Sequence, residues 1–211
     1  YGIEMDVQIT KDGVPVVFHD FTLERMCGKK GKVCDHTWQE LKDLKLAGSQ
    51  EAIPLFADVL KTVDGRVPLI VEIKVEWTDL RVCPAADALL RGYQGLYCIE
   101  SFNPLVLLWY RRNHKEVVRG QLSDGFVKES RIRESWHLLI QNFLLQNLLF
   151  NWLTKPDFVA YNHKHEKILA RRVCRGLYGN MAAAWTIKSQ EELERAGKQF
   201  DLFIFDSFLP K

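Results

Sequence analysis

Two hydrophobic periods alternate along this chain. Short runs rich in β-branched and apolar residues are typical of strands, and longer stretches with apolar residues three or four positions apart are typical of helices. The strand-like runs are residues 3–10, 69–74, 96–101, 117–122, 158–162, 182–187 and 202–206. The helical stretches are residues 38–46, 55–63, 79–92, 105–114, 129–153, 165–178 and 190–198. Strands alternating with helices predict a parallel sheet joined by helical crossovers.

The number of predicted strands narrows the fold class. Seven strands exceed the five or six of an ordinary doubly wound sheet, and no G-x-G-x-x-G turn follows the first of them. We therefore expect an α/β fold of the (β/α)8 TIM-barrel type that lacks its first β–α unit. We expect a single barrel domain over residues 1–211, incomplete at its N-terminus, with residues 124–155 forming a helical insertion or an extended helix within it.

Candidate chemistry is concentrated in the stretch 3–20, which reads IEMDVQITKDGVPVVFHD. Glu4 and Asp6 are two positions apart, so on a strand they point to the same face. The Lys11-Asp12-Gly13 sequence predicts a tight reversal, because glycine readily adopts a positive φ. A reversal centred there forms a small β-hairpin, places position 4 opposite position 20 and returns His19 beside Glu4. We expect this hairpin to lie at the catalytic face of the barrel.

The two carboxylates need a positively charged partner. Burying Glu4 and Asp6 together without one would be very costly. The residues alone leave open whether this partner is a metal ion or a basic side chain such as Lys74. A histidine beside a carboxylate pair is suited to metal-assisted acid–base chemistry. His19 is also compatible with a purely structural position at the end of the hairpin.

Composition and charge exclude some classes of function. The chain has 47% hydrophobic and 27% charged residues and a formal net charge of +2, as in an ordinary globular protein. This mixed charge gives no electrostatic case for nucleic-acid binding, for which a basic stripe is expected. The five cysteines are scattered and form no C-x-x-C pair. They favour reduced thiols, and we expect a cytoplasmic protein.

Residues 136–153, WHLLIQNFLLQNLLFNWL, form an unusual segment. Uncharged polar residues recur every four to five positions, which predicts a helix with a narrow polar stripe and a wide apolar face. The polar interruptions make the segment a poor transmembrane span. An ordinary, largely buried outer helix is the favoured interpretation. A lid or membrane-surface element and a homodimer interface remain the alternatives, although the lack of Lys or Arg on the stripe weakens membrane contact.

Three sequence elements together resemble a known family. The pattern IExDVxxTKDGxxVVxHD, followed by LxR and by EIK some fifty residues later, resembles the glycerophosphodiester phosphodiesterases. The first element is the stretch 3–20, and the others stand as Leu23-Glu24-Arg25 and Val71-Glu72-Ile73-Lys74. The likeness extends to Ile53-Pro54-Leu55, Ser101-Phe102-Asn103 and Ala184-Trp185-Thr186, so it covers nearly the whole chain.

The resemblance implies a metal-dependent barrel enzyme that hydrolyses glycerophosphodiesters to sn-glycerol 3-phosphate and an alcohol. It implies that Glu4, Asp6 and Glu72 bind a divalent cation, Ca²⁺ or Mg²⁺, and that His19 is catalytic. It also implies that Lys74 and Trp185 contact the substrate. Alternatives are a lysophospholipase D-type phosphodiesterase and a non-catalytic barrel that binds phosphodiesters or a protein.

The chain departs from this family at its first strand. In the family, that strand ends in His-Arg-Gly, which carries a second catalytic histidine and a phosphate-binding arginine, and this motif is not in the sequence. The departure falls at the same place as the β–α unit that the strand count finds missing. From these two observations we expect the chain by itself to have little or no activity.

Overall fold

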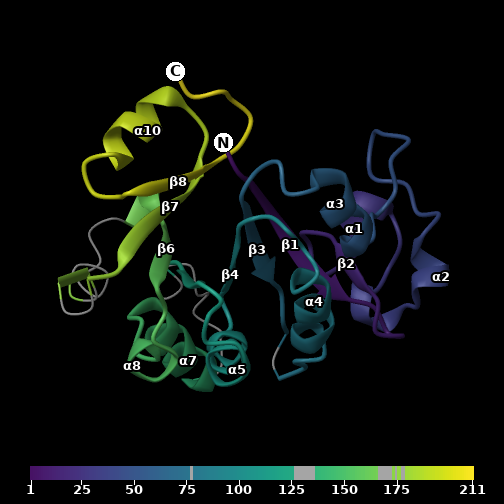
Figure 1. Ribbon diagram of the computed structural model, residues 1–211, viewed down its shortest axis with the longest axis horizontal. Coiled ribbons are helices and arrows are strands. Elements are labelled where there is room, and N and C mark those ends of the chain that lie inside the picture. The colour runs from purple at the N-terminus through teal and green to yellow at the C-terminus, as the bar shows by residue number, and fades with distance from the viewer. Residues whose placement is uncertain (77, 126–135, 166–172, 174, 177–178) are drawn as a thin grey trace. The chain divides into compact units, whose positions relative to one another are not determined.

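A computed structural model describes residues 1–76, 78–125, 136–165, 173, 175–176 and 179–211 (Figure 1). The chain divides into two compact units, Tyr1–Trp109 and Tyr110–Lys211. Each unit contains parallel strands linked by helices, as the alternating sequence pattern predicts. Organisation as one barrel domain stays a prediction.

The first unit contains four strands in the spatial order β2-β1-β3-β4. Strands β1, β3 and β4 are parallel, and β2 is antiparallel to β1. The strands are β1 (Ile3–Ile9), β2 (Pro15–Val17), β3 (Leu69–Ile73) and β4 (Tyr97–Ser101). The helices are α1 (Glu24–Cys27), η1 (Val33–Asp35), α2 (Trp38–Leu41), α3 (Phe56–Val63) and α4 (Val82–Leu90), and α5 (Pro104–Asn113) crosses the boundary in sequence between the units.

The second unit contains four parallel strands that pair in chain order. They are β5 (Arg119–Ser123), β6 (Phe158–Asn162), β7 (Met181–Ile187) and β8 (Leu202–Phe205). The described helices are α7 (Trp136–Gln146), α8 (Asn151–Thr154), η2 (His163–His165) and α10 (Gln190–Ala196). All seven strands predicted from the sequence are confirmed, each with ends within two residues of the expected positions.

The hairpin of the first unit has the predicted register. Val7 pairs with Val17 across the β1–β2 ladder, so position 4 falls opposite position 20. Gly13 has a φ of 84°, the left-handed conformation for which glycine is suited. Beyond β2, the backbone N–H of Phe18 donates to the Asp6 carbonyl at 2.9 Å, which continues the pairing. The end of the returning chain is therefore fixed beside Asp6.

Apolar packing sets which face of β1 carries the carboxylates. Met5, Val7 and Ile9 are buried, and β1 contacts helix α4, which also buries its apolar residues. Each fully buried large apolar side chain contributes roughly 1.5–3 kcal/mol. A one-residue slip would exchange the two faces of the strand and lose this burial. The packing thus directs Glu4, Asp6 and Gln8 to the opposite face.

The prediction of one helix from residue 129 to residue 153 is wrong in its described part. Helix α7 ends at Gln146, and Leu148 adopts a φ of 55°. The N–H of Leu148 donates to the Leu145 carbonyl and that of Leu149 to the Leu144 carbonyl, which is a Schellman stop. Helix α8 starts only at Asn151, so no continuous polar stripe runs from 136 to 153. Residues 126–135 and most of the predicted helix 165–178 lie outside the described residues.

Helices 38–46 and 79–92 were predicted too long, since α2 ends at Leu41 and α4 covers only Val82–Leu90. Two helices begin with residues typical of helix N-termini. Ser189 accepts a hydrogen bond from the Glu192 N–H, and α5 begins at Pro104.

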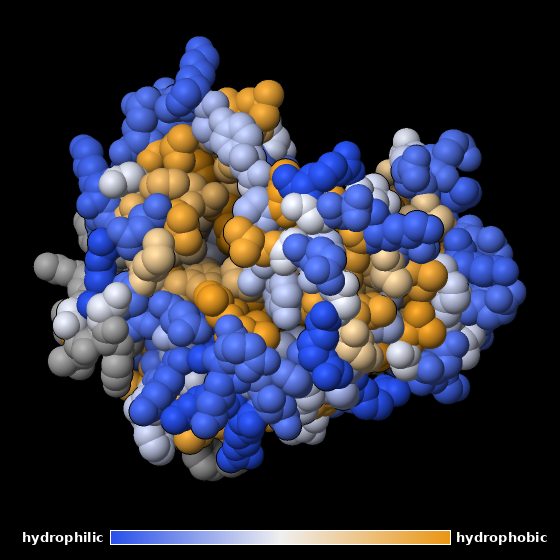
Figure 2. All heavy atoms as spheres, viewed as in Figure 1, coloured by the Kyte–Doolittle hydropathy of each residue, from blue (hydrophilic) through white to orange (hydrophobic). Residues whose placement is uncertain are grey.

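Hydrophobic residues reach the surface at several places on the face shown in Figure 2. In the segment 136–153, the described side chains of Ile140, Phe143, Leu149 and Trp152 are exposed. Among the residues that the structure describes, every helix is too short or too polar to cross a lipid bilayer. Membrane-surface contact and a homodimer interface through this segment stay predictions.

Candidate active site

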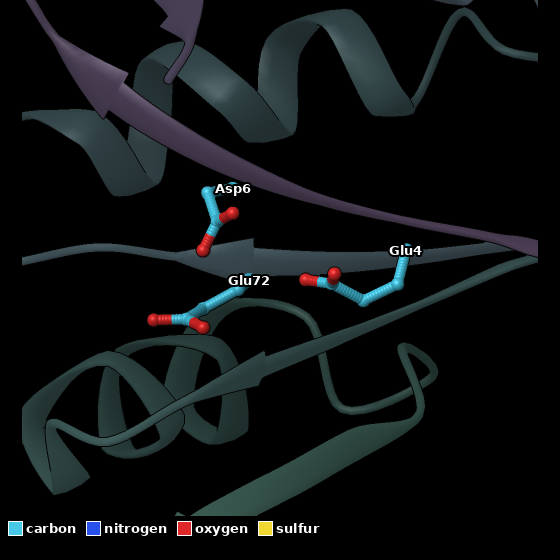
Figure 3. A group of neighbouring side chains, drawn as sticks. All are labelled: Glu4, Asp6 and Glu72. Atoms are coloured by element: carbon cyan, nitrogen blue, oxygen red, sulfur yellow. The ribbon is translucent and has the colours of Figure 1, made fainter. Parts of the chain in front are cut away.

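Three carboxylates from two neighbouring strands converge on one point. Asp6 of β1 pairs with Glu72 of β3 in the parallel ladder, and Glu4 precedes Asp6 by two positions. The three side chains point toward one another on the same face of the sheet (Figure 3). Carboxylate oxygens of Glu4, Asp6 and Glu72 lie within 4.8 Å of one another. The structure thus brings together all three residues that the family resemblance assigns to a cation.

Lys74 follows β3 and adds one positive charge to this cluster. Its ammonium Nζ lies 3.0 Å from a carboxylate oxygen of Asp6 and 3.0 Å from one of Glu72. Its side chain is only 9% exposed, and the Phe21 ring lies over it with its centroid 5.7 Å from Nζ. The sequence leaves open whether a basic side chain or a metal ion neutralises Glu4 and Asp6, and the geometry is compatible with both.

The single positive charge of Lys74 does not balance the three carboxylates of the cluster. Burial, together with repulsion from Asp6 and Glu72, raises the pKa of Glu4 to about 8. Burial likewise raises the pKa of Glu72 to about 7, against the attraction of Lys74. Burial disfavours the ammonium of Lys74, but attraction to Glu72 and Asp6 outweighs it and leaves the Lys74 pKa raised. The carboxylates thus favour additional positive charge.

The donor set fits a hard divalent cation. Carboxylate oxygens are the ligands that Ca²⁺ and Mg²⁺ prefer, and waters or substrate oxygens usually complete their coordination. The site contains no sulfur or imidazole donor among its three converging side chains, so a soft transition metal is disfavoured.

His19 lies at the end of the hairpin, with its ring 72% exposed. Its Nδ1 is 2.7 Å from Oδ1 of Asp20. Arg25 holds the same carboxylate with two hydrogen bonds, from Nε at 2.6 Å and from Nη2 at 2.8 Å. These bonds from Arg25 lower the pKa of Asp20 to about 2, so Asp20 accepts hydrogen bonds at neutral pH. Nδ1 of His19 must then carry a proton, which leaves Nε2 for proton exchange.

Gln8 fixes the backbone on both sides of His19. Its side chain is buried, and Nε2 donates to the carbonyl of Phe18 at 2.7 Å and to that of Asp20 at 2.8 Å. Because Gln8 itself belongs to β1, these bonds tie the residues around the histidine to the strand that carries Glu4 and Asp6.

We expect Gln8→Met to lower the free energy of unfolding by about 1–3 kcal/mol, because it removes one buried and one partly buried hydrogen bond from the carbonyls of Phe18 and Asp20. Urea unfolding measures this change. Gln94→Met is the matched control, since Gln94 is exposed and its effect should stay within about 0.5 kcal/mol. Equal effects of the two substitutions would contradict this account of Gln8.

The sequence analysis missed the roles of some residues in and around the site. The resemblance includes Arg25, but only the structure shows that it orients Asp20. Gln8 and a fourth carboxylate, the buried Glu100 of β4, were also missed. A charged residue within the otherwise apolar run 96–101 was the available signal for Glu100. Trp185 is half-buried in β7 of the second unit, and its substrate role stays a prediction.

Comparison with known proteins places this geometry in a family. The chain matches the Glycerophosphoryl diester phosphodiesterase family over residues 1–196. It is 28% identical over 209 residues to a glycerophosphodiester phosphodiesterase of Caldanaerobacter subterraneus subsp. tengcongensis, a match that covers 92% of this chain and 76% of that protein. It is 25% identical over 172 residues to the Homo sapiens glycerophosphodiester phosphodiesterase 1, covering 72% of this chain and half of the human protein's length.

A solved structure shows the same fold. The Oleispira antarctica phosphodiesterase OLEI02445, in complex with the product sn-glycerol-3-phosphate, superimposes with a TM-score of 0.75 at 22% identity. The match covers 97% of this chain and 80% of that one. It supports the prediction of an α/β, TIM-barrel-like fold. With the family match over residues 1–196, these findings show that the chain belongs to the glycerophosphoryl diester phosphodiesterase family.

Proposed function

We propose that this chain provides the catalytic carboxylates, an acid and a phosphate-binding lysine for hydrolysis of glycerophosphodiesters to sn-glycerol 3-phosphate and an alcohol. The observation that carries the proposal is the convergence of Glu4, Asp6 and Glu72 within 4.8 Å. Membership of the family, and the product held by the Oleispira antarctica structure, support the same reaction.

Glu4, Asp6 and Glu72 would hold the divalent cation, Ca²⁺ or Mg²⁺. When bound, the cation would supply Lewis-acid neutralisation of a phosphate oxygen. The raised pKa values of Glu4 and Glu72 come from burial first and from repulsion among the carboxylates next. They support this assignment, because a bound cation would offset both effects.

The remaining residues act on the substrate. Lys74 supplies a second positive charge for the phosphate, and it already lies among the carboxylates. His19 protonates the departing alkoxide through Nε2, while Asp20 accepts from Nδ1 and stabilises the imidazolium. Trp185 contacts the glycerol part of the substrate.

A product assay tests the proposal. The protein that carries this chain is incubated with glycerophosphocholine or with lysophosphatidylcholine, in Ca²⁺, in Mg²⁺ or in EDTA, and released choline and sn-glycerol 3-phosphate are measured. We expect cleavage of glycerophosphocholine that EDTA abolishes and added cation restores. Preference for lysophosphatidylcholine would instead assign a lysophospholipase D-type activity. Binding of either diester without turnover would favour the non-catalytic barrel and contradict the proposal.

A further inference from the structure

Glu100 extends the carboxylate cluster along the sheet. In the parallel ladders, Asp6 of β1 pairs with Glu72 of β3, and Glu72 pairs with Glu100 of β4. Residues that pair directly across neighbouring strands point to the same face, with strands about 4.8 Å apart. Asp6, Glu72 and Glu100 therefore form one row across three strands, and the face they share is the one on which the carboxylates of Figure 3 converge.

The carboxyl group of Glu100 is deeply buried and forms no ion pair within the part of the chain that the structure describes. The residue is 1% exposed, and among the described residues its Oε2 has no hydrogen-bond partner. Among the described residues, the ammonium of Lys74 forms ion pairs with Asp6 and Glu72 but not with Glu100. Burial, followed by repulsion from Glu4 and Glu72, holds the pKa of Glu100 well above its ordinary value. One ammonium thus faces four carboxylates.

Another buried acid in the same unit is paired. Asp87 of α4 is also buried, but the Arg91 guanidinium Nε lies 3.0 Å from its Oδ2. An unpaired buried carboxyl costs several kcal/mol, and a residue of that kind is expected where an ion or a reaction requires it. Because Glu100 belongs to the carboxylate row, we expect the divalent cation of that row to be the ion that requires it.

We propose that Glu100 is a fourth cation-binding carboxylate of this site and that it makes the site selective for Ca²⁺ over Mg²⁺. Ca²⁺ accepts six to eight oxygen ligands in flexible geometry, so it benefits from an additional carboxylate. Mg²⁺ demands a near-ideal octahedron and usually keeps several waters, so it gains little from one. This inference rests on the proposed function only in assuming that Glu4, Asp6 and Glu72 bind a divalent cation.

Direct binding measurements test the inference without substrate. Isothermal titration calorimetry of the metal-free protein with Ca²⁺ and with Mg²⁺ gives both dissociation constants for the unaltered protein and for Glu100→Gln. Glutamine keeps the size of the side chain and removes its charge. We expect the Ca²⁺ dissociation constant to rise at least about tenfold, and the Mg²⁺ constant to change less than about threefold. Glu51→Gln, at an exposed position away from the row, should change neither constant.

Each outcome decides a separate point. Unchanged or tighter Ca²⁺ binding by a folded Glu100→Gln protein would overturn the inference, and equal losses for both ions would overturn the selectivity. If Glu100→Gln does not fold, Glu100→Asp serves in its place, because the shortened carboxylate should weaken Ca²⁺ binding while retaining the charge. If the unaltered protein binds neither ion, the cation site of the proposed function fails as well. Absence of turnover by an unaltered protein that binds Ca²⁺ would count against the proposed function alone.

Discussion

Replacing His19 with alanine in the protein that carries this chain should lower kcat by about 10²–10⁴-fold, the contribution typical of a positioned general acid. The ring is largely exposed and packs little, so the free energy of unfolding should change by less than about 0.5 kcal/mol. The loss should appear in kcat more than in KM, because protonation of the leaving group is required only in the transition state. Steady-state kinetics and urea unfolding measure the two effects.

His114→Ala is the matched control for this substitution. His114 also lies beside a carboxylate, with its Nδ1 3.2 Å from Glu116, but it belongs to the second unit and is not part of the proposed machinery. We expect its kcat to equal that of the unaltered protein. Near-normal turnover of the His19 variant would remove this histidine from the mechanism. A loss shared equally by both variants would indicate a general effect on the protein.

Local sequence rules were sufficient to predict the common face of Glu4 and Asp6 and the hairpin that follows them. The spacing of Glu4 and Asp6 fixes their common face, because side chains alternate along a strand. The glycine of the reversal fixes where the chain turns, and the confirmed β1–β2 register follows from that turn. Both rules act over a few residues, so neither depends on how distant segments pack.

Glu100 shows where such rules stop. Its effect depends on the pairing of β3 with β4, which joins residues 28 positions apart in the row that contains Glu72. Neither hydrophobic period nor motif spacing gives the register between two parallel strands joined by a helix. The family resemblance supplied Glu72 and Lys74, but the neighbouring carboxylate needed the structure.

The end of helix α7 shows a second limit. A Schellman stop usually has glycine at its left-handed position, and here that position is Leu148. A leucine there costs roughly 1–2 kcal/mol, which the burial of its own side chain offsets. Tertiary packing rather than a glycine ends the helix, so no local signal marks its end and the helix was predicted too long.

The metal-free protein should lose stability as the pH rises from about 5 to about 8. The folded-state pKa values of Glu4, about 8, and Glu72, about 7, lie above the ordinary value of 4.5. In this range the folded state binds more protons than the unfolded state, so the free energy of unfolding falls as pH increases. Titrating independently over this range, the two groups would contribute about 7 kcal/mol, since each unit of pKa shift corresponds to about 1.4 kcal/mol. Because the two groups interact, part of that sum is counted twice, and we expect a smaller fall, on the order of 3 kcal/mol. Asp20, with its lowered pKa of about 2, contributes only below this range.

Urea unfolding in EDTA at pH 5, 6, 7 and 8 measures this slope. A variant carrying both Glu4→Gln and Glu72→Gln should have a flatter pH profile, because the two titrating groups are gone. If the free energy of unfolding in EDTA is constant or rises with pH, the pKa values of Glu4 and Glu72 are not raised in the folded protein. Adding Ca²⁺ at a hundred times its dissociation constant should stabilise the unaltered protein by about 2.7 kcal/mol at pH 8. At pH 5 the same Ca²⁺ concentration should stabilise it less, because protons then compete with the cation for the same oxygens.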